Sequence, residues 1–290
     1  MKDIERLKGT GVAVITPFDQ KGEVDFQSLD GIVRRLVNGG IDYLVALGTT
    51  AETSTLSASE KKAVLDQIIK SAEGKLPIVL GIGSNNTSQV LNDLELYDED
   101  EVVAILSVSP YYNRPSQDGI HQHFSAIADK SRKPIILYNV PGRTGSNMEA
   151  DTILKLAKHK NIIGIKDATD DLSQINKVIM NRPDDFLVIS GEDSQTFYTM
   201  CLGGDGVISV IGNLLPKSVC DLVKLTKKGD LQKAREVNQY LTPFFSLITK
   251  EGNPTSIKAG LASQNLCTTQ VRLPLVKATQ GLQSEFKELL

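Results

Sequence analysis

One lysine lies where a lysine is costly to bury. The segment "IIGIKDAT", residues 162–169, places Lys166 directly after an apolar run. A lysine at the end of a buried strand loses hydration, which lowers its pKa and favours the neutral amine that attacks carbonyl carbons. Lys166 is therefore a candidate Schiff-base nucleophile. The alternative is a structural ion pair with Asp167 or Glu192, because buried lysines are rare unless they are paired.

Three further segments carry side chains that could assist such a nucleophile. Tyr138 ends the preceding apolar run, "IILYNVP", where it either exchanges protons beside the lysine or only caps the sheet. In "GTT", Thr49 and Thr50 offer hydroxyls and backbone N–H groups to a carboxylate, unless the segment is an ordinary tight turn. Arg143, in "NVPGRTG", either binds a second carboxylate or lies on the surface.

Eight short apolar runs rich in β-branched residues would position these side chains. They are "GVAVITPF", "DYLVALGTT", "PIVLGIG", "VVAILSVSP", "KPIILYNVP", "NIIGIKD", "DFLVISGED" and "DGVISVIGN". Segments of helical periodicity separate them, including residues 25–40 and residues 57–74, which begin with a capping box at Ser57 or Ser59. Apolar runs without polar alternation are typical of parallel strands buried on both faces. The pattern predicts an α/β fold, a (β/α)8 TIM barrel whose site lies at the C-terminal ends of the strands.

The chain beyond the eighth run shows no further strand pattern. Residues 216–229, residues 230–249 and the segments from Pro254 onward are expected to be helical. We therefore predict a catalytic barrel domain over residues 1–228 and a short helical C-terminal extension over residues 229–290. A doubly wound sheet is the alternative, but the turn "TPFDQKGEV" after the first run lacks a glycine-rich phosphate motif.

Composition and charge exclude several classes of function. The formal net charge is −3 and no Lys/Arg-rich segment occurs, so we expect no nucleic-acid partner and no membrane association. The segment "MKDIERLKGTG" does not resemble a signal peptide, and no apolar run approaches the roughly 18 residues of a spanning helix. The three cysteines are far apart, which argues against a disulfide framework. We expect a cytoplasmic protein.

Neither a metal nor a cofactor is expected. No His/Asp/Glu cluster follows the apolar runs, and neither a P-loop nor a nucleotide fingerprint occurs. His121 and His123 form an H-x-H pair without a third ligand nearby, so we expect both on a solvated surface.

Four motifs together resemble a known family. "GTTAETSTLS", "SPYYNRPSQDGIHQHF", "ILYNVPGRTG" and "IIGIKDAT" occur in the order and spacing of the class I Schiff-base pyruvate aldolases. They are most similar to the dihydrodipicolinate synthase (4-hydroxy-tetrahydrodipicolinate synthase) family, over essentially the whole chain. The resemblance implies that pyruvate forms an imine with Lys166 and that the derived enamine attacks L-aspartate 4-semialdehyde. The product, 4-hydroxy-tetrahydrodipicolinate, would serve lysine and diaminopimelate biosynthesis.

The resemblance also implies roles for individual residues. A proton relay would consist of Thr49, Tyr138 and Tyr112, with Tyr112 entering the site of a neighbouring subunit. An obligate dimer follows from that role, and two dimers would form a homotetramer.

The same resemblance implies how the substrates are bound. Thr49 and Thr50 would hold the pyruvate carboxylate, and Arg143 would meet the carboxylate of the semialdehyde. Ile208, in "GVISV", would lie near the lysine through its backbone.

The chain departs from the family pattern in the loop "GTTAE". Ala51 stands where the family usually has glycine. If that position requires a positive φ, a side chain there costs about 1–2 kcal/mol. Alanine is the mildest such change, so we expect a small adjustment of the loop.

A second departure concerns feedback inhibition by lysine. Lysine-sensitive members commonly carry an acid and a histidine where this chain has Gln89 and Ala58, and Lys61 follows one turn later. Loss of an anion and gain of a cation disfavour a cationic ligand. We predict weak or absent inhibition. The remaining candidate allosteric residues are Ser54, Asn85 and Tyr111.

Two rival functions remain. An N-acetylneuraminate lyase or a keto-deoxy sugar acid aldolase of the same superfamily would share the imine lysine and the tyrosine, but Arg143 argues against them. A non-catalytic binding barrel is disfavoured because the set of implied catalytic residues is intact: Lys166, Tyr138, Thr49 and Tyr112.

Overall fold

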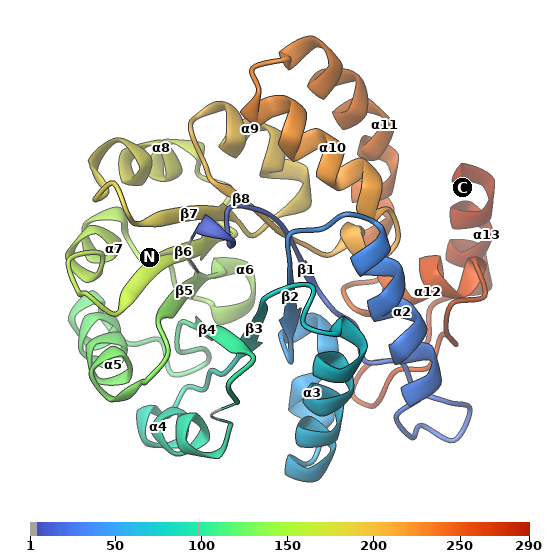
Figure 1. The fold of residues 1–290 in the computed structure, drawn as a ribbon, viewed down its shortest axis with the longest axis horizontal. Coiled ribbons are helices and arrows are strands. Elements are labelled where there is room, and N and C mark those ends of the chain that lie inside the picture. Colours follow the sequence, from blue (N-terminus) through green and yellow to red (C-terminus); the bar gives the residue numbers. More distant parts are fainter. Residues whose placement is uncertain (1–4, 98) are drawn as a thin grey trace.

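The computed structural model is a closed barrel of eight parallel strands in sequential order (Figure 1). It describes residues 5–97 and 99–290, so the first four residues of the N-terminal segment considered above lie outside the described residues. The strands are β1 (Gly9–Ala13), β2 (Tyr43–Ala46), β3 (Ile78–Gly81), β4 (Val102–Val108), β5 (Ile135–Asn139), β6 (Ile162–Asp167), β7 (Leu187–Ser190) and β8 (Gly206–Ser209). The predicted (β/α)8 barrel is confirmed.

Helices surround the strands and follow them along the chain (Figure 1). They are α2 (Phe26–Asn38), α3 (Ala58–Ala72), α4 (Thr87–Leu96), α5 (Gln117–Lys130), α6 (Pro141–Thr144), α7 (Ala150–Leu156), α8 (Leu172–Asn181), α9 (Thr196–Cys201) and α10 (Pro216–Lys227). Short 3-10 segments follow three of the strands: η1 (Thr49–Ala51), η2 (Thr53–Thr55), η3 (Asp193–Gln195) and η4 (Ile211–Asn213). The capping box of α3 uses Ser57 and Glu60, the first of the two predicted registers.

The C-terminal region contains three helices and one long irregular segment. The helices are α11 (Leu231–Lys250), α12 (Thr255–Ser263) and α13 (Gln280–Leu289). The prediction that the segments from Pro254 onward are helical is therefore wrong for residues 264–279. This segment contains β-branched residues and Pro274, which disfavour helix, and its polar groups bind distant loops instead: Thr268 Oγ1 donates to the carbonyl of Phe18. The division of the chain at residue 228 stays a prediction.

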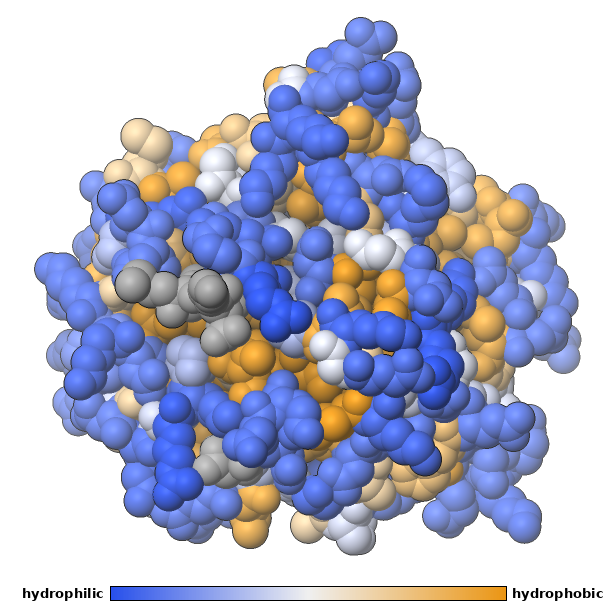
Figure 2. All heavy atoms as spheres, viewed as in Figure 1, coloured by the Kyte–Doolittle hydropathy of each residue, from blue (hydrophilic) through white to orange (hydrophobic). Residues whose placement is uncertain are grey.

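Two apolar cores result from the alternation of side chains along the strands. The larger core lies between the strands and the helices. The smaller one fills the barrel and contains Tyr43, Tyr138, Leu187, Ile189 and Ile208. Figure 2 shows one end of the barrel, where hydrophobic residues gather near the centre within a mostly hydrophilic periphery. Among the described residues, no helix combines the length and the apolar character needed to cross a bilayer.

Candidate active site

Lys166 and Tyr138 lie next to each other inside the barrel. The register of β5 and β6 makes them direct partners on neighbouring strands. Lys166 is 5% exposed and Tyr138 is 7% exposed, and the lysine Nζ lies 4.3 Å from the centroid of the tyrosine ring. The sequence placed both residues at neighbouring strand ends, and the structure brings the amine and the phenol ring together.

The structural ion pair considered for Lys166 does not form. Within residues 5–97 and 99–290, Lys166 Nζ has no carboxylate at ion-pair distance. Asp167 points to the opposite side of β6, where its carboxylate accepts from Asn139 Nδ2 at 3.0 Å and from the Thr169 N–H at 3.1 Å. Burial raises the pKa of Asp167 to about 6. Burial also raises the pKa of Glu192, although the nearby Lys166 charge opposes this. A buried amine without an ion-pair partner suits nucleophilic attack on a carbonyl.

Ile208 faces the same interior from β8. It is 1% exposed and packs in the core that contains Tyr138. The backbone after it is fixed by Asp193, a residue that the sequence did not single out. The Asp193 carboxylate accepts from the N–H groups of Val210 and Ile211, each at 2.8 Å, and from the Ser209 hydroxyl.

The turn after β2 presents the threonines expected to bind a carboxylate. Thr49 is exposed and Thr50 is 3% exposed. The N–H of Ala51 donates to Gly48 at 3.0 Å and the N–H of Glu52 donates to Thr49 at 3.1 Å, so within the turn the N–H groups of both threonines have no partner. Positive φ angles occur at Leu47 (53°) and Glu52 (54°) and not at Ala51, so the strain considered for Ala51 does not arise.

Asn253 connects this turn with Arg143. Its Nδ2 donates to Thr50 Oγ1 at 3.0 Å, and its backbone carbonyl accepts from Arg143 Nη2 at 3.2 Å. The Oδ1 atom of Asn253 is buried and has no hydrogen-bond partner. The sequence did not identify Asn253, because an Asn-Pro pair signals only a turn. The structure thus joins two predicted carboxylate-binding groups through a residue of the C-terminal region.

Tyr112 does not share the interior with Lys166. It is 89% exposed, has a φ of 72°, and its N–H donates to the Thr144 carbonyl at 3.4 Å. A single chain therefore holds Lys166, Tyr138, Thr49 and the Thr50 turn but leaves the Tyr112 phenol in solvent.

Two of the candidate allosteric residues are linked through Asn113. Asn113 Nδ2 donates to the carbonyl of Asn85 at 2.9 Å, and its N–H donates to the carbonyl of Tyr111 at 2.9 Å. The other two candidates, Ser54 and Gln89, are exposed.

His123 does not lie on a solvated surface, so that prediction is wrong. It is 5% exposed on the inner face of α5, together with Ile120, Phe124 and Ile127, which share its face at helical spacing. Its Nδ1 lies 2.8 Å from Thr87 Oγ1, and burial lowers the pKa of His123 to about 4. No group of three or more His, Cys, Asp or Glu side chains suited to a metal occurs in the part of the chain that the structure describes.

A surface hollow of about 590 Å³ lies between α2 and α10, away from these side chains. None of the predicted site residues lines it. The barrel interior is therefore the better candidate for chemistry.

Comparison with known proteins gives a consistent result. The model of the dihydrodipicolinate synthetase family matches residues 6–290. A 4-hydroxy-tetrahydrodipicolinate synthase of Flavobacterium psychrophilum is 48% identical over 277 residues, which are 95% of this chain and 94% of the relative. The enzyme of the same name from Parabacteroides distasonis is 45% identical over 291 residues, covering 100% of this chain and 98% of the relative.

Solved structures agree with the sequence relatives. A monomeric dihydrodipicolinate synthase variant superposes with a TM-score of 0.95 at 36% identity, covering 99% of this chain and 96% of that one. The Acinetobacter baumannii enzyme complexed with pyruvate has a TM-score of 0.94 at 36% identity, with 97% of both chains covered. The Cyanidioschyzon merolae enzyme with lysine bound has a TM-score of 0.94 at 31% identity, covering 98% of this chain and 97% of that one. The chain is an enzyme of the dihydrodipicolinate synthetase family.

Proposed function

We propose that this enzyme condenses pyruvate with L-aspartate 4-semialdehyde through an imine on Lys166 and releases 4-hydroxy-tetrahydrodipicolinate. The observation that carries the proposal is the buried Lys166 amine, which lies on the Tyr138 ring without an ion-pair partner. The shared name of the relatives and the pyruvate bound to the Acinetobacter baumannii enzyme support it.

The chemistry follows from an amine nucleophile. The neutral Lys166 amine adds to C2 of pyruvate, and loss of water gives the imine. Loss of a proton from the methyl carbon gives the enamine, whose carbon forms the new bond to the aldehyde of the semialdehyde. The amino group of the attached semialdehyde then attacks C2, closes the ring and displaces the lysine.

Proton transfer in this scheme falls to hydroxyl groups. Tyr138 lies beside the amine, and Thr49 lies in the turn that follows β2, at the same end of the barrel. The exposed Tyr112 suits a role in the site of a second copy of the chain. We propose that two copies complete each other's sites in this way and that two such dimers form a homotetramer.

The substrate carboxylates would bind to the two groups that Asn253 connects, the turn with Thr50 and the side chain of Arg143. The N–H groups and hydroxyls of Thr49 and Thr50 would hold the pyruvate carboxylate, and Arg143 would bind the carboxylate of the semialdehyde. The backbone beside Ile208 would border the imine.

Borohydride trapping tests the proposal. We expect intact mass spectrometry to show one pyruvyl adduct on the wild type and none on Lys166→Ala. Lys160→Ala, which removes an exposed lysine just before β6, should form the adduct normally. An unmodified wild type would overturn the proposal. Turnover of sialic acid without turnover of the semialdehyde would keep the imine but assign the enzyme to the sugar-acid branch.

We further propose that lysine inhibits this enzyme weakly or not at all. Gln89 stands at the position of the acid, and its neutral amide cannot balance the charge of a cationic ligand. The same amide donates to Asp93 Oδ1 at 2.8 Å. The wild type should keep most of its activity in millimolar lysine, and Gln89→Glu should become more sensitive, whereas Gln122→Glu on α5 should not. Strong inhibition of the wild type at sub-millimolar lysine would contradict the proposal.

A further inference from the structure

A buried ion pair lies directly behind the turn that carries Thr49 and Thr50. Glu52, the residue after η1, is 3% exposed, and Lys258 of α12 is 0% exposed. The Lys258 ammonium donates to Glu52 Oε1 and to the carbonyl of Gln270 at 2.9 Å, and it lies 4.1 Å from the centroid of the Phe18 ring. Burial lowers the pKa of Lys258, and the Glu52 carboxylate opposes that shift.

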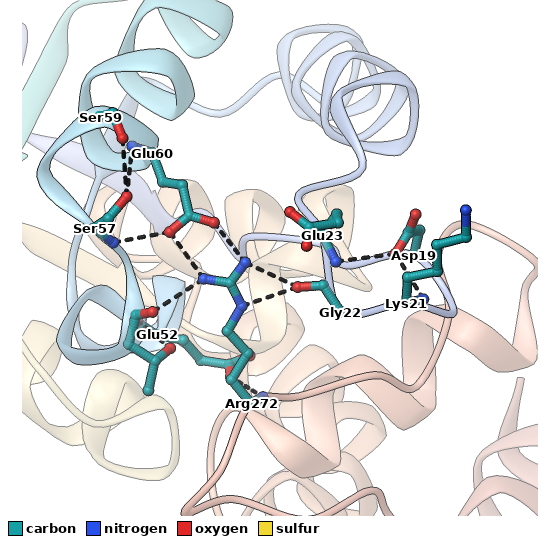
Figure 3. A network of polar contacts seen from close by, with 10 residues as sticks. Asp19, Lys21, Gly22, Glu23, Glu52, Ser57, Ser59, Glu60 and Arg272 are labelled. Carbon is teal, nitrogen blue, oxygen red and sulfur yellow. Dashed lines mark hydrogen bonds and ion pairs between the residues drawn. The ribbon is translucent and has the colours of Figure 1, made fainter.

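The irregular segment after α12 supplies a second contact to the same carboxylate. The backbone N–H of Arg272 donates to Glu52 Oε2 at 2.9 Å. The Arg272 guanidinium binds Glu60 and the carbonyls of Thr55 and Gly22, so this arginine connects the chain after β1 with the chain after β2 (Figure 3). Both oxygens of Glu52 are thus held by residues of the C-terminal region.

The backbone of the turn is held in a conformation that side chains rarely adopt. Glu52 has φ 54° and ψ 36°, and Leu47, on the other side of the turn, has φ 53°. Such angles at residues other than glycine persist where surrounding contacts enforce them, and they gather at functional sites. The Thr53 hydroxyl bonds the carbonyls of Leu47 and Gly48, each at 2.8 Å, from within the turn's own chain. The contacts from outside the turn are those that Glu52 accepts from Lys258 and from the Arg272 N–H.

A buried ion pair is weak evidence for stability by itself. Desolvation of two charges often offsets their attraction, and apolar residues of similar volume serve as well. Position is therefore the informative property of this pair. Glu52 is the residue directly after Thr49, Thr50 and Ala51. Asn253, from the same C-terminal region as Lys258, donates a hydrogen bond to the Thr50 hydroxyl.

We propose that Glu52 and Lys258 form a clamp through which the C-terminal region positions Thr49 and Thr50 for the pyruvate carboxylate. Both are positioning residues, because their side chains act through the turn and do not reach the reacting atoms. The inference rests on the proposed function, since it assigns the turn to pyruvate. It deepens that function by making affinity for the first substrate depend on residues more than 200 positions further along the chain.

Three variants test the clamp: Glu52→Gln, Lys258→Met and the double variant that combines them. The single variants leave one buried charge without its partner, whereas the double variant removes both charges and should fold. The readouts are thermal unfolding, the pyruvate dependence of borohydride trapping, and separate KM values for the two substrates. We expect the double variant to unfold near the wild-type temperature yet to need about ten times more pyruvate for half-maximal trapping. The KM for the semialdehyde should change less than about twofold.

A purely structural role gives a different pattern. In that case the double variant would recover the wild-type pyruvate dependence together with the wild-type stability, and the inference would fall. Glu52→Asp provides a second test, because it keeps the charge and shortens the side chain. It should raise the pyruvate KM at least about threefold, and an unchanged KM would overturn the clamp even if the double variant did not fold.

Two controls separate this inference from the proposed function. Lys250→Met breaks an exposed ion pair of the C-terminal region, Lys250 with Glu285, and should leave pyruvate trapping unchanged. A wild type that forms no adduct refutes the proposed function itself. If the wild type forms the adduct and the clamp variants show the same pyruvate dependence as the wild type, the clamp is refuted and the proposed function stands.

Discussion

Two lysines of the described chain are buried, and their surroundings differ in one respect. Lys166 lies 4.3 Å from the centroid of the Tyr138 ring, and Lys258 lies 4.1 Å from that of Phe18. Lys258 has a carboxylate and a carbonyl as partners, whereas Lys166 has no ion pair among residues 5–97 and 99–290. A similar aromatic contact therefore accompanies a paired cation in one region and an unpaired amine in the other.

The difference shows how one barrel uses the same side chain for anchoring and for chemistry. Lys258 binds the Glu52 carboxylate and the Gln270 carbonyl, so its contacts hold two distant segments of the chain together. Lys166 has no ion-pair partner among the described residues and lies against the Tyr138 ring, and an amine is the group that adds to a carbonyl carbon. The phenol beside Lys166 can also exchange protons, which the phenyl ring of Phe18 cannot.

The largest expected effect is the loss of chemistry when Lys166 is replaced. Lys166→Met should lower kcat at least about a thousandfold, because no other residue supplies the amine for the covalent intermediate. Lys258→Met should retain a measurable kcat, since it leaves the amine in place. Steady-state assays with saturating pyruvate measure both. Equal losses in the two variants would remove the distinction between the lysines.

Stability should respond in the opposite order. Lys258→Met leaves the Glu52 carboxylate buried without its cation, which should lower the free energy of unfolding by about 3–5 kcal/mol. Lys166→Met removes an amine that has no ion pair and should change the free energy of unfolding by less than about 1 kcal/mol. Urea unfolding followed by circular dichroism distinguishes the two. A large loss in Lys166→Met would show that Lys166 has a structural partner after all.

The region around Lys166 could be predicted from the sequence because strand order determines it. Apolar runs without polar alternation indicated a parallel barrel, and consecutive runs in a barrel are neighbours. That reasoning brought Tyr138 and Lys166 together, and the register pairs them. The roles of these residues came from chemistry and from resemblance, and the exposed Tyr112 would not have been selected without the resemblance.

The region around Lys258 could not be predicted in the same way. Asn253 and Thr50 are 203 residues apart, and Lys258 and Glu52 are 206 residues apart, so no local pattern links them. The one signal is that Lys258 stands in "SIKAGL", a run of otherwise small and apolar residues that the structure buries throughout. His123 was misplaced for a related reason. The H-x-H spacing drew attention to a metal pair, although residue 123 shares a helix face with Ile120 and Ile127.

Removal of one hydroxyl should sharpen the comparison of the two aromatic contacts. Tyr138→Phe makes the ring beside Lys166 equivalent to the one beside Lys258. We expect kcat to fall about 100-fold, because proton transfer loses the hydroxyl of the ring beside Lys166, while the stability changes by less than about 0.5 kcal/mol. The trapped adduct should still form, but slowly, in a time course of borohydride quenching. A wild-type rate would assign the proton transfers to other groups.

The smallest expected effect concerns acid and a carboxyl group of the Lys258 region. Arg272 holds the pKa of Glu60 at about 2, below its ordinary value of 4.5, chiefly through hydrogen bonds to the carboxylate. A depressed carboxyl pKa contributes stability that is fully present above pH 4.5. In that range the carboxyl group is ionised in both the folded and the unfolded state, so its favourable contacts in the folded state count in full. The contribution is lost as the pH falls from 4.5 towards 2, where the unfolded state binds the proton first.

Arg272→Met should remove this dependence. Between pH 5 and pH 3 the wild type should lose about 1 kcal/mol more stability than the variant, a value reduced by the partial exposure of both side chains. The measurement is urea unfolding of the two proteins at both pH values. Glu60→Gln should behave like Arg272→Met, since either change removes the titrating pair. Parallel losses in all three proteins would place the acid-sensitive groups elsewhere, and Arg272 would then connect its loops through the Gly22 and Thr55 carbonyls, which do not titrate.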